Sequence, residues 1–438
     1  MKLKSYKKKE FSFKGKCIFT ILMLIAIQIV SCIPLYGINR EYLSIWLTED
    51  MENAFSLFNL FSGNAFSQMS IFVIGISPYI TSSIILQLLT MAIPRLEEIV
   101  KDGKVGQDKF KKITYIVAGA LAIIQSIPIA INFGRSGLLI EYNALYVSIV
   151  SISMIIGSVI MIYCGKLIDD YGIGNGISLI LLTNILSRVP SDIGTIYEMF
   201  CKGKNISAYV FTLFVSFAVI AVALIGVIFL QDGEKKVKVN SSARIKGNKS
   251  VSNGVNNEIP MKVNMAGVMP VIFASSLFQT YTLIITLLGA DQTSIWYNIS
   301  RYFNSRYWFN IHSLKYTWGF VIYCLLIYFF TIFYSVIVFN PIEVSNNLRK
   351  SGATIPGIRP GKPTADYLTQ KMKSLRVVGA IMLIGVSLVP ILVAAFSGLS
   401  SLSFGGTSII IIVGVILETY QKIHTERLMK NHTTFLHL

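Results

Sequence analysis

The chain has 438 residues, of which 53% are hydrophobic and only 14% are charged, and its mean hydropathy is +0.62. A soluble protein of this length would need a larger polar surface, so the composition excludes that class and indicates a polytopic membrane protein. The formal net charge of +17 comes mainly from Lys and Arg residues that lie between long apolar runs.

Ten apolar runs are long enough to cross a bilayer. They cover residues 17–37, 71–93, 113–133, 145–165, 174–190, 207–230, 266–288, 318–338, 376–396 and 405–421. The first is followed by neither a cleavage-like motif nor a long soluble domain, so we interpret it as a retained helix. With ten spans both termini lie on one side, and that side carries 31 of the 39 Lys and Arg residues. The positive-inside rule then predicts that both termini are cytoplasmic.

Two segments near the second run are unusual. The run itself holds small and polar residues that a simple lipid anchor does not need, namely Gly75, Pro78, Thr81, Ser82, Ser83 and Gln87. They predict a helix that faces protein or water on one side. The preceding segment, 54–69, is amphipathic, broken at Gly63 and too short to span. It fits either a surface helix or a re-entrant helix.

Two basic cytoplasmic loops exceed what topology requires. In the loop 231–263, the alternation Lys236–Val237–Lys238–Val239 predicts a strand, and a following SNG turn predicts a hairpin. In the loop 340–375, Gly and Pro residues predict a shaped loop between two short helices. Their charge fits the positive-inside rule or anionic lipid, and equally an acidic protein or RNA phosphates.

The spans lack chemistry-bearing groups. No Asp, Glu, Lys or Arg lies well inside a span, and all four histidines lie outside the spans. This weighs against ion-coupled transporters and cation-selective pores. The sequence has no HExxH, P-loop or GxSxG motif, and its five cysteines form no CxxC pair. We therefore expect no catalytic, metal or cofactor site.

Five segments carry a resemblance to a known family. They are GISPYITSSIILQLL at 75–89, GIGNGISLILL at 172–182, KVNMAGVMPVIFASS at 262–276, FNPIEVSNNLRKSGATIPGIRPGKPT at 339–364 and FGGTSIIIIVGV at 404–415. All resemble segments of the SecY family, the pore subunit of the Sec protein-translocation channel, and they occur in the family order. With the ten spans, the resemblance covers nearly the whole chain.

The resemblance implies an all-α membrane fold of ten transmembrane helices around a central pore. Two pseudo-symmetric halves would comprise residues 1–200 with spans 1–5 and residues 201–438 with spans 6–10. An apolar ring would constrict the pore, formed by Ile76, Ile80, Leu181, Ile185, Ile272 and Ile411. Considered singly, each of these could instead face lipid or a protein core. The segment 54–69 would be a re-entrant plug, represented by Phe58, Phe61, Gly63 and Phe66 and made flexible by its glycine.

The resemblance also implies a lateral gate to lipid between spans 2–3 and 7–8. Its polar cluster would be Gln87, Gln125 and Asn264, whose side chains either satisfy one another in the closed gate or bond to nearby backbone. The basic loops would dock the ribosome, including its rRNA, and the SecA motor ATPase. Candidate docking residues are Arg359, Arg244, Lys246 and Lys249.

We therefore expect a channel subunit in a bacterial plasma membrane that conducts unfolded secretory proteins and releases transmembrane segments into lipid. Signal sequences, nascent chains, membrane lipids and SecE-like and SecG-like small subunits would be its partners. Two alternatives stay open. One is a small-molecule carrier with two five-helix halves, which would need polar groups converging at the midplane. The other is an insertase or substrate-restricted accessory translocon with the same fold.

Overall fold

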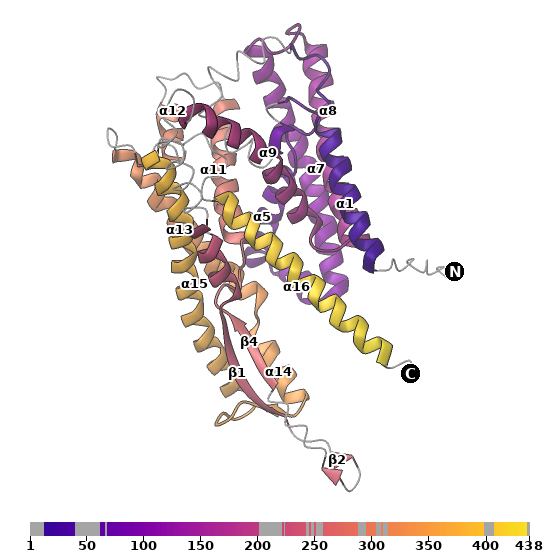
Figure 1. The fold of residues 1–438 in the computed structure, drawn as a ribbon, viewed down its shortest axis with the longest axis vertical. Helices are drawn as coiled ribbons and strands as arrows, with labels where there is room; N and C mark the ends of the chain where they lie inside the picture. The colour runs from indigo at the N-terminus through magenta and orange to yellow at the C-terminus, as the bar shows by residue number, and fades with distance from the viewer. Residues whose placement is uncertain are drawn as a thin grey trace, which may run out of the picture.

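The computed structural model describes residues 13–39, 62–65, 68–200, 221–222, 224–241, 245–246, 249–250, 257–287, 295–303, 308–309, 314–397 and 407–435. Long helices dominate this part of the chain, and they run side by side in a bundle with a small sheet at one end (Figure 1). Every one of the ten predicted apolar runs contains helical residues. Five of the described helices are long and apolar enough to span a membrane singly, and a bent pair makes a sixth.

The first five runs correspond to five principal helices and one short one. They are α1 (Phe13–Val30), α5 (Ser77–Ala92), α6 (Pro94–Lys101), α7 (Gly103–Arg135), α8 (Ala144–Tyr171) and α9 (Gly176–Phe200). Helix α7 packs between α5 and α8, while α1 lies against α8 and α9. Helix α5 ends at Ala92. The next residue, Ile93, is extended because Pro94 follows it, and α6 then turns away by 110°.

The second half begins with helical residues 221–222 and 224–232 and continues with longer helices. They are α11 (Met269–Leu287), α13 (Thr317–Val338), α14 (Pro341–Lys350), α15 (Lys362–Ser397) and α16 (Thr407–Phe435). Between α11 and α13 lie α12 (Ile295–Ser300) and the 3₁₀ turns η2 (Arg301–Phe303) and η4 (Leu314–Tyr316). Helix α13 packs between α11 and α15.

The antiparallel strand pairing predicted for the first basic loop is confirmed, and its predicted SNG turn at 252–254 lies outside the described residues. Strand β1 (Glu234–Ser241) pairs antiparallel with β4 (Asn257–Lys262), and the two-residue strands β2 (Ile245–Lys246) and β3 (Lys249–Ser250) form a small ribbon beyond them. The other edge of β1 pairs with β5 (Ala353–Thr354), so one three-stranded sheet joins both basic loops. Within the described residues, the named strands all lie in the two basic loops, and the all-α membrane fold is confirmed.

One expectation for the second basic loop is wrong. Its first helix, α14, is short, but the second is the start of α15, which continues for 36 residues through the ninth run. The continuity has a physical cause, because no Gly or Pro interrupts residues 364–378. We call the sheet β4-β1-β5, helix α14 and residues 353–375 the cytoplasmic unit, after the side of the membrane that the positive-inside rule predicts for it. Its members share a hydrophobic core built around Val237, Met261, Ile355, Leu368 and Met372.

Candidate functional site

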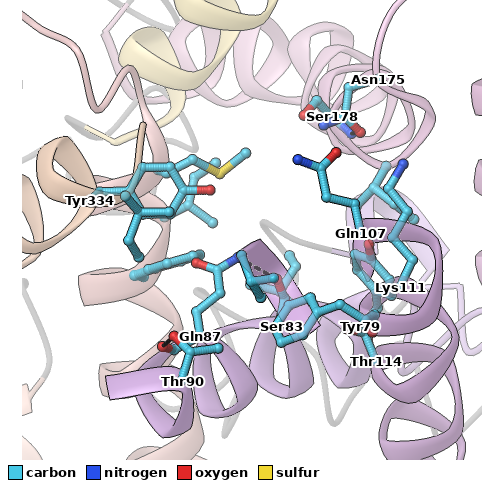
Figure 2. Close-up of a pocket in the computed structure, with 18 of the residues that line it drawn as sticks. Tyr79, Ser83, Gln87, Thr90, Gln107, Lys111, Thr114, Asn175, Ser178 and Tyr334 are labelled. Carbon is cyan, nitrogen blue, oxygen red and sulfur yellow. Dashed lines mark hydrogen bonds between the residues drawn. The ribbon is translucent and has the colours of Figure 1, made fainter. Parts of the chain in front are cut away.

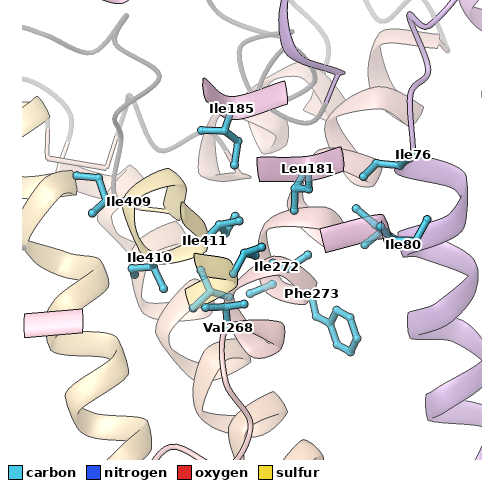
Figure 3. Close-up of a cluster of buried hydrophobic side chains, with 14 of the residues drawn as sticks. Ile76, Ile80, Leu181, Ile185, Val268, Ile272, Phe273, Ile409, Ile410 and Ile411 are labelled. Atoms are coloured by element: carbon cyan, nitrogen blue, oxygen red, sulfur yellow. The ribbon is translucent and has the colours of Figure 1, made fainter. Parts of the chain in front are cut away.

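The six candidate ring residues lie in one buried apolar cluster. Ile76 immediately precedes α5 and Ile80 lies in its first turn, while Leu181 and Ile185 lie one turn apart on α9. Ile272 comes from α11 and Ile411 from α16, so both halves of the chain contribute. Their side chains are at most 6% exposed, and Figure 3 shows them gathered from helices far apart in sequence. Such a set of branched side chains offers no hydrogen-bonding group to a passing molecule.

The start of α9 explains how the GIGNG segment positions Leu181 and Ile185. Gly174 has a φ of +95°, which favours glycine, and the Asp169 carboxylate accepts a 2.7 Å hydrogen bond from the Gly176 N–H. A Cβ on Gly176 would lie 2.0 Å from the Gly165 carbonyl oxygen. The turn thus brings α9 directly against α8 and fixes the position of Leu181 and Ile185 along the axis of α9.

The described part of the candidate plug packs against α9. Gly63 begins the 3₁₀ turn η1 (Gly63–Ala65) with a φ of +67°, and a Cβ there would lie 2.9 Å from the Asn184 carbonyl oxygen. Ala65 is fully buried in the same apolar cluster as the ring candidates. The glycine is thus required by backbone geometry and close packing. Phe58, Phe61 and Phe66 lie outside the described residues.

A cavity of about 390 Å³ adjoins the ring candidates and is lined by both halves (Figure 2). The N-terminal half supplies most of its polar groups, from Tyr79, Ser83, Gln87, Thr90, Gln107, Lys111, Thr114, Asn175 and Ser178. The C-terminal half supplies mainly apolar ones, from Met269, Ile272, Phe273 and Ile337, with Tyr334 as the exception. The two walls therefore differ in polarity, and a molecule between them would meet an amphipathic surface.

The expectation that the three gate amides bond one another is wrong for this structure. The Gln87 amide nitrogen donates to Ser83 Oγ at 3.0 Å, and Asn264 Nδ2 donates to the Gly267 carbonyl at 2.8 Å. The side-chain carbonyl oxygens of Gln87, Gln125 and Asn264 are all buried without a hydrogen-bond partner. Local groups therefore accept from Gln87 and Asn264, and Asn264 bonds to the backbone as the second alternative expects. The helices themselves do meet, because α11 contacts both α5 and α7.

Sequence reasoning missed Tyr334. It projects from α13 into the cavity opposite the α5 wall that carries Gln87 (Figure 2), and its ring packs edge-to-face on Phe273 at 5.7 Å. A tyrosine buries its ring and needs a partner for its hydroxyl, so Tyr334 brings one polar group to the otherwise apolar wall of the cavity. The sequence did contain a clue, because Tyr334 is a residue with a polar tip near the C-terminal end of the very apolar eighth run.

Two buried hydroxyl groups form hydrogen bonds to the backbone of the loop that carries Arg359. Thr364 Oγ1 donates to the Arg359 carbonyl and Ser345 Oγ donates to the Gly361 carbonyl, each at 2.8 Å. Gly357 and Gly361 have positive φ values, which the tight path requires. Arg359 is exposed at the surface of the cytoplasmic unit. Arg244 lies outside the described residues, while Lys246 and Lys249 lie in the distal ribbon of β2 and β3.

The first turn of α1 and the later turns of α16 meet on the side of the basic loops. Lys16 Nζ at the start of α1 lies 3.3 Å from a Glu426 carboxylate oxygen on α16, and Arg427 lies over the Phe13 ring. Lys262 of β4 donates a hydrogen bond to Gln421 of the same helix. Helix α16 thus contacts both α1 and the sheet.

The SecY family model matches residues 70–420. The chain belongs to the SecY family. It is 36% identical to the protein translocase subunit SecY of Bacillus subtilis (strain 168), over 97% of this chain and 96% of that relative. It is 34% identical to the subunit of the same name from Corynebacterium glutamicum, over 98% of each chain.

Solved structures support the same SecY-type fold. A protein-conducting channel superposes with a TM-score of 0.68 at 18% identity, covering 97% of this chain and 95% of that chain. Sec61 in the canine ribosome-channel complex from the endoplasmic reticulum gives 0.66 at 17% identity, covering 97% and 95%. The chain is therefore a multi-pass membrane protein with the ten-helix fold of these channels. All five segments quoted from the sequence lie within the region that the SecY family model matches.

Proposed function

We propose that this chain is the channel-forming subunit of a Sec translocon in a bacterial plasma membrane. It conducts unfolded secretory proteins and releases transmembrane segments sideways into lipid. The observation that carries the proposal is the buried apolar cluster at the ring positions, which both halves build beside a cavity that they share. Relatives at 34–36% identity are named protein translocase subunits.

In this proposal the ring of Ile76, Ile80, Leu181, Ile185, Ile272 and Ile411 seals the empty pore. Apolar constrictions exclude ions by dewetting, and branched side chains adapt to a moving peptide without binding it. The plug, residues 54–69, covers the ring, and its Gly63–Ala65 turn rests on α9. Opening separates α5 and α7 from α11 and α13, which exposes Gln87, Gln125, Asn264 and Tyr334 to an incoming segment.

The cytoplasmic unit is proposed to dock the machines that supply energy, because no nucleotide-binding motif occurs in the chain. Arg359 on its supported loop, with Arg244, Lys246 and Lys249, would contact ribosomal RNA or an acidic surface of a SecA-type motor. A ribosome-bound Sec61 is among the similar structures. SecE-like and SecG-like subunits would complete the channel, and both termini would be cytoplasmic, on the side of the basic loops.

Photocrosslinking from the ring tests the proposal. A photoreactive residue replaces Ile80 or Ile272, and the matched control is Ile381, which is 61% exposed on α15. A ribosome-stalled secretory chain is supplied to membranes that contain the protein. We expect adducts from the two ring positions only, and only with a functional signal sequence. Adducts absent from both positions, while an established channel crosslinks in parallel, would refute the pore and favour the carrier alternative.

The range of substrate proteins distinguishes a general channel from an insertase or an accessory translocon. The same ring positions are tested with a panel of stalled chains, some fully secreted and some with transmembrane segments. Adducts with many unrelated secreted chains are expected. Adducts restricted to membrane proteins, or to one class of secreted chain, would replace the general assignment with the narrower one.

A further inference from the structure

An aromatic cluster caps the ends of α11 and α13 that lie away from the cytoplasmic unit. The Phe278 ring of α11 contacts Phe303, Trp308 and Tyr323, with centroids 4.9, 5.8 and 5.5 Å away. Tyr281, one turn further along α11, lies 4.1 Å from the Phe303 ring. Phe303 and Trp308 of the segment between the two helices therefore pack into the same hydrophobic cluster as α11 and α13.

This segment is fixed to the first turn of α13. Trp308 Nε1 donates to the Tyr302 carbonyl at 2.8 Å, and Thr317 Oγ1 donates to the Trp308 carbonyl at 2.7 Å. Gly319 lets the chain approach so closely that a Cβ there would lie 1.7 Å from the Tyr302 carbonyl oxygen. Together with the aromatic contacts, these bonds make residues 301–303 and 308–309 move with α11 and α13 as one body.

The outer surface of this cap has the composition of a membrane interface. Ile295 and Trp296 on α12 are 76% and 58% exposed, and Trp318 on the first turn of α13 is 67% exposed. Below Trp318 the exposed face of α13 continues with apolar residues, including Leu325 and Phe329. Figure 1 places α12 at the end of the bundle opposite β1 and β4. An apolar strip thus runs from the lipid-facing side of a span onto the cap.

Cations and a hydroxyl border this strip. The Arg301 guanidinium contacts the Tyr316 hydroxyl at 3.4 Å, and the Lys315 ammonium lies 5.2 Å from the Tyr316 ring centroid. Tryptophan rings prefer the headgroup level of a bilayer, and flanking Lys and Arg residues reach the phosphates there. Water would be a poor neighbour for Ile295 and Trp296 side by side on a six-residue helix.

We propose that α12 and the first turn of α13 form an interfacial anchor, a surface that binds phospholipid in the leaflet away from the cytoplasmic unit. Trp296 and Trp318 lie at the level of the glycerol backbone and upper acyl chains, with Arg301 and Lys315 toward the phosphates. The partner is the lipid interface itself. The consequence for gating rests on the proposed function: the anchor sets the depth of α11 and α13, so opening displaces α5 and α7 relative to them.

Fluorescence quenching by brominated phospholipid tests the anchor. The protein is reconstituted into vesicles with Trp46→Phe as the common background, because Trp46 lies outside the described residues. Trp296→Phe, Trp318→Phe and Trp308→Phe are then compared, in bilayers with and without bromine on the upper acyl chains. Trp308 is the matched control, since it belongs to the same cap but is only 2% exposed. Acrylamide reports exposure to water in parallel.

We expect Trp296→Phe and Trp318→Phe each to remove about half of the lipid-quenchable emission, because both rings lie at the interface, and Trp308→Phe to leave it unchanged. The anchor is overturned if Trp296→Phe leaves that emission unchanged. A fall in acrylamide quenching would then place the ring in water, and no change in either would mean that protein covers it. If Trp308→Phe fails to reconstitute, the other two variants still decide. The measurement needs no transport, so it stands apart from a failure of the channel proposal.

Discussion

A single glycine sets how closely α8 approaches the segment that precedes α5. A Cβ on Gly157 of α8 would lie 2.1 Å from the Ile71 carbonyl oxygen, whereas one on Gly119 of α7 would meet nothing within 4 Å. We predict that Gly157→Ala destabilises the protein by about 2 kcal/mol, because overpacking forces backbone to shift. Gly119→Ala is the matched control and leaves stability unchanged or slightly higher. Thermal unfolding in detergent measures both, and equal midpoints would contradict the close packing.

At the ring, the polarity of one side chain decides whether the constriction holds water. Ile272 is 4% exposed within the apolar cluster. We predict that Ile272→Ser raises the ion conductance of the reconstituted, substrate-free protein, because a hydroxyl at a dewetted constriction stabilises water there. Ile381→Ser on the lipid-facing side of α15 makes the same chemical change and leaves conductance at the background level. Planar-bilayer recordings compare the two, and equal leakage from both would remove Ile272 from the ring.

At the residue scale, the burial of the ring candidates agrees with the prediction, whereas hydrogen-bond partners were not predicted. The motifs located Ile76 and Ile411, and both are fully buried in one cluster, although their role in a pore stays a prediction. The role of the three amides in a gate also stays a prediction, and the hydrogen bonds of Gln87 and Asn264 differ from a mutually bonded cluster. An amide in an apolar helix can bond either to a hydroxyl one turn away or to a distant side chain. Gln87 bonds to the nearby hydroxyl of Ser83. Sequence spacing alone does not decide that competition.

Among the elements, the sheet shows which strands a sequence pattern can predict and which it cannot. The Lys–Val alternation predicted β1 because one face of a half-buried strand is apolar, and Val237 and Val239 are indeed buried. Strand β5 was missed because two residues, Ala353 and Thr354, carry no periodicity. It exists through tertiary pairing with Asn240 and Ser241. The sequence therefore did not predict that one sheet joins the two basic loops.

Because one sheet joins the two basic loops, a change in their shared core should affect both loops. Leu368 of α15 is fully buried beneath both loops. Leu368→Ala should cost about 3 kcal/mol of local stability by leaving a cavity, and it should loosen the β1–β4 hairpin and the Arg359 loop together. Limited proteolysis of the reconstituted protein is expected to cut both loops faster. Ile342→Ala, at a 65% exposed position of α14, leaves the rates unchanged. Faster cutting in only one loop would show that the loops are independent.

For the whole molecule, the sequence predicted ten spans because apolar length is set by bilayer thickness, and each run contains helical residues. It did not predict which helices touch. Contacts between α5 and α11 and between α7 and α11 join the halves across the proposed gate, while α9 contacts α16 behind it. Contacts between helices depend on side-chain shape at positions far apart in sequence, as in the pairing of Phe273 on α11 with Tyr334 on α13.

The two halves, residues 1–200 and 201–438, should move apart along the cavity during transport. In a background without the five native cysteines, Ser83→Cys on α5 and Phe273→Cys on α11 place one thiol on each wall of the cavity. Joining them with a short bifunctional reagent is expected to stop translocation of a secretory chain, because α5 and α11 can no longer separate. Cleaving the linker should restore it. The matched control joins Thr90→Cys to Gln107→Cys, which line the same cavity within the N-terminal half. That link leaves transport intact if the halves move as rigid bodies, whereas a block from both links would place the essential motion inside the N-terminal half.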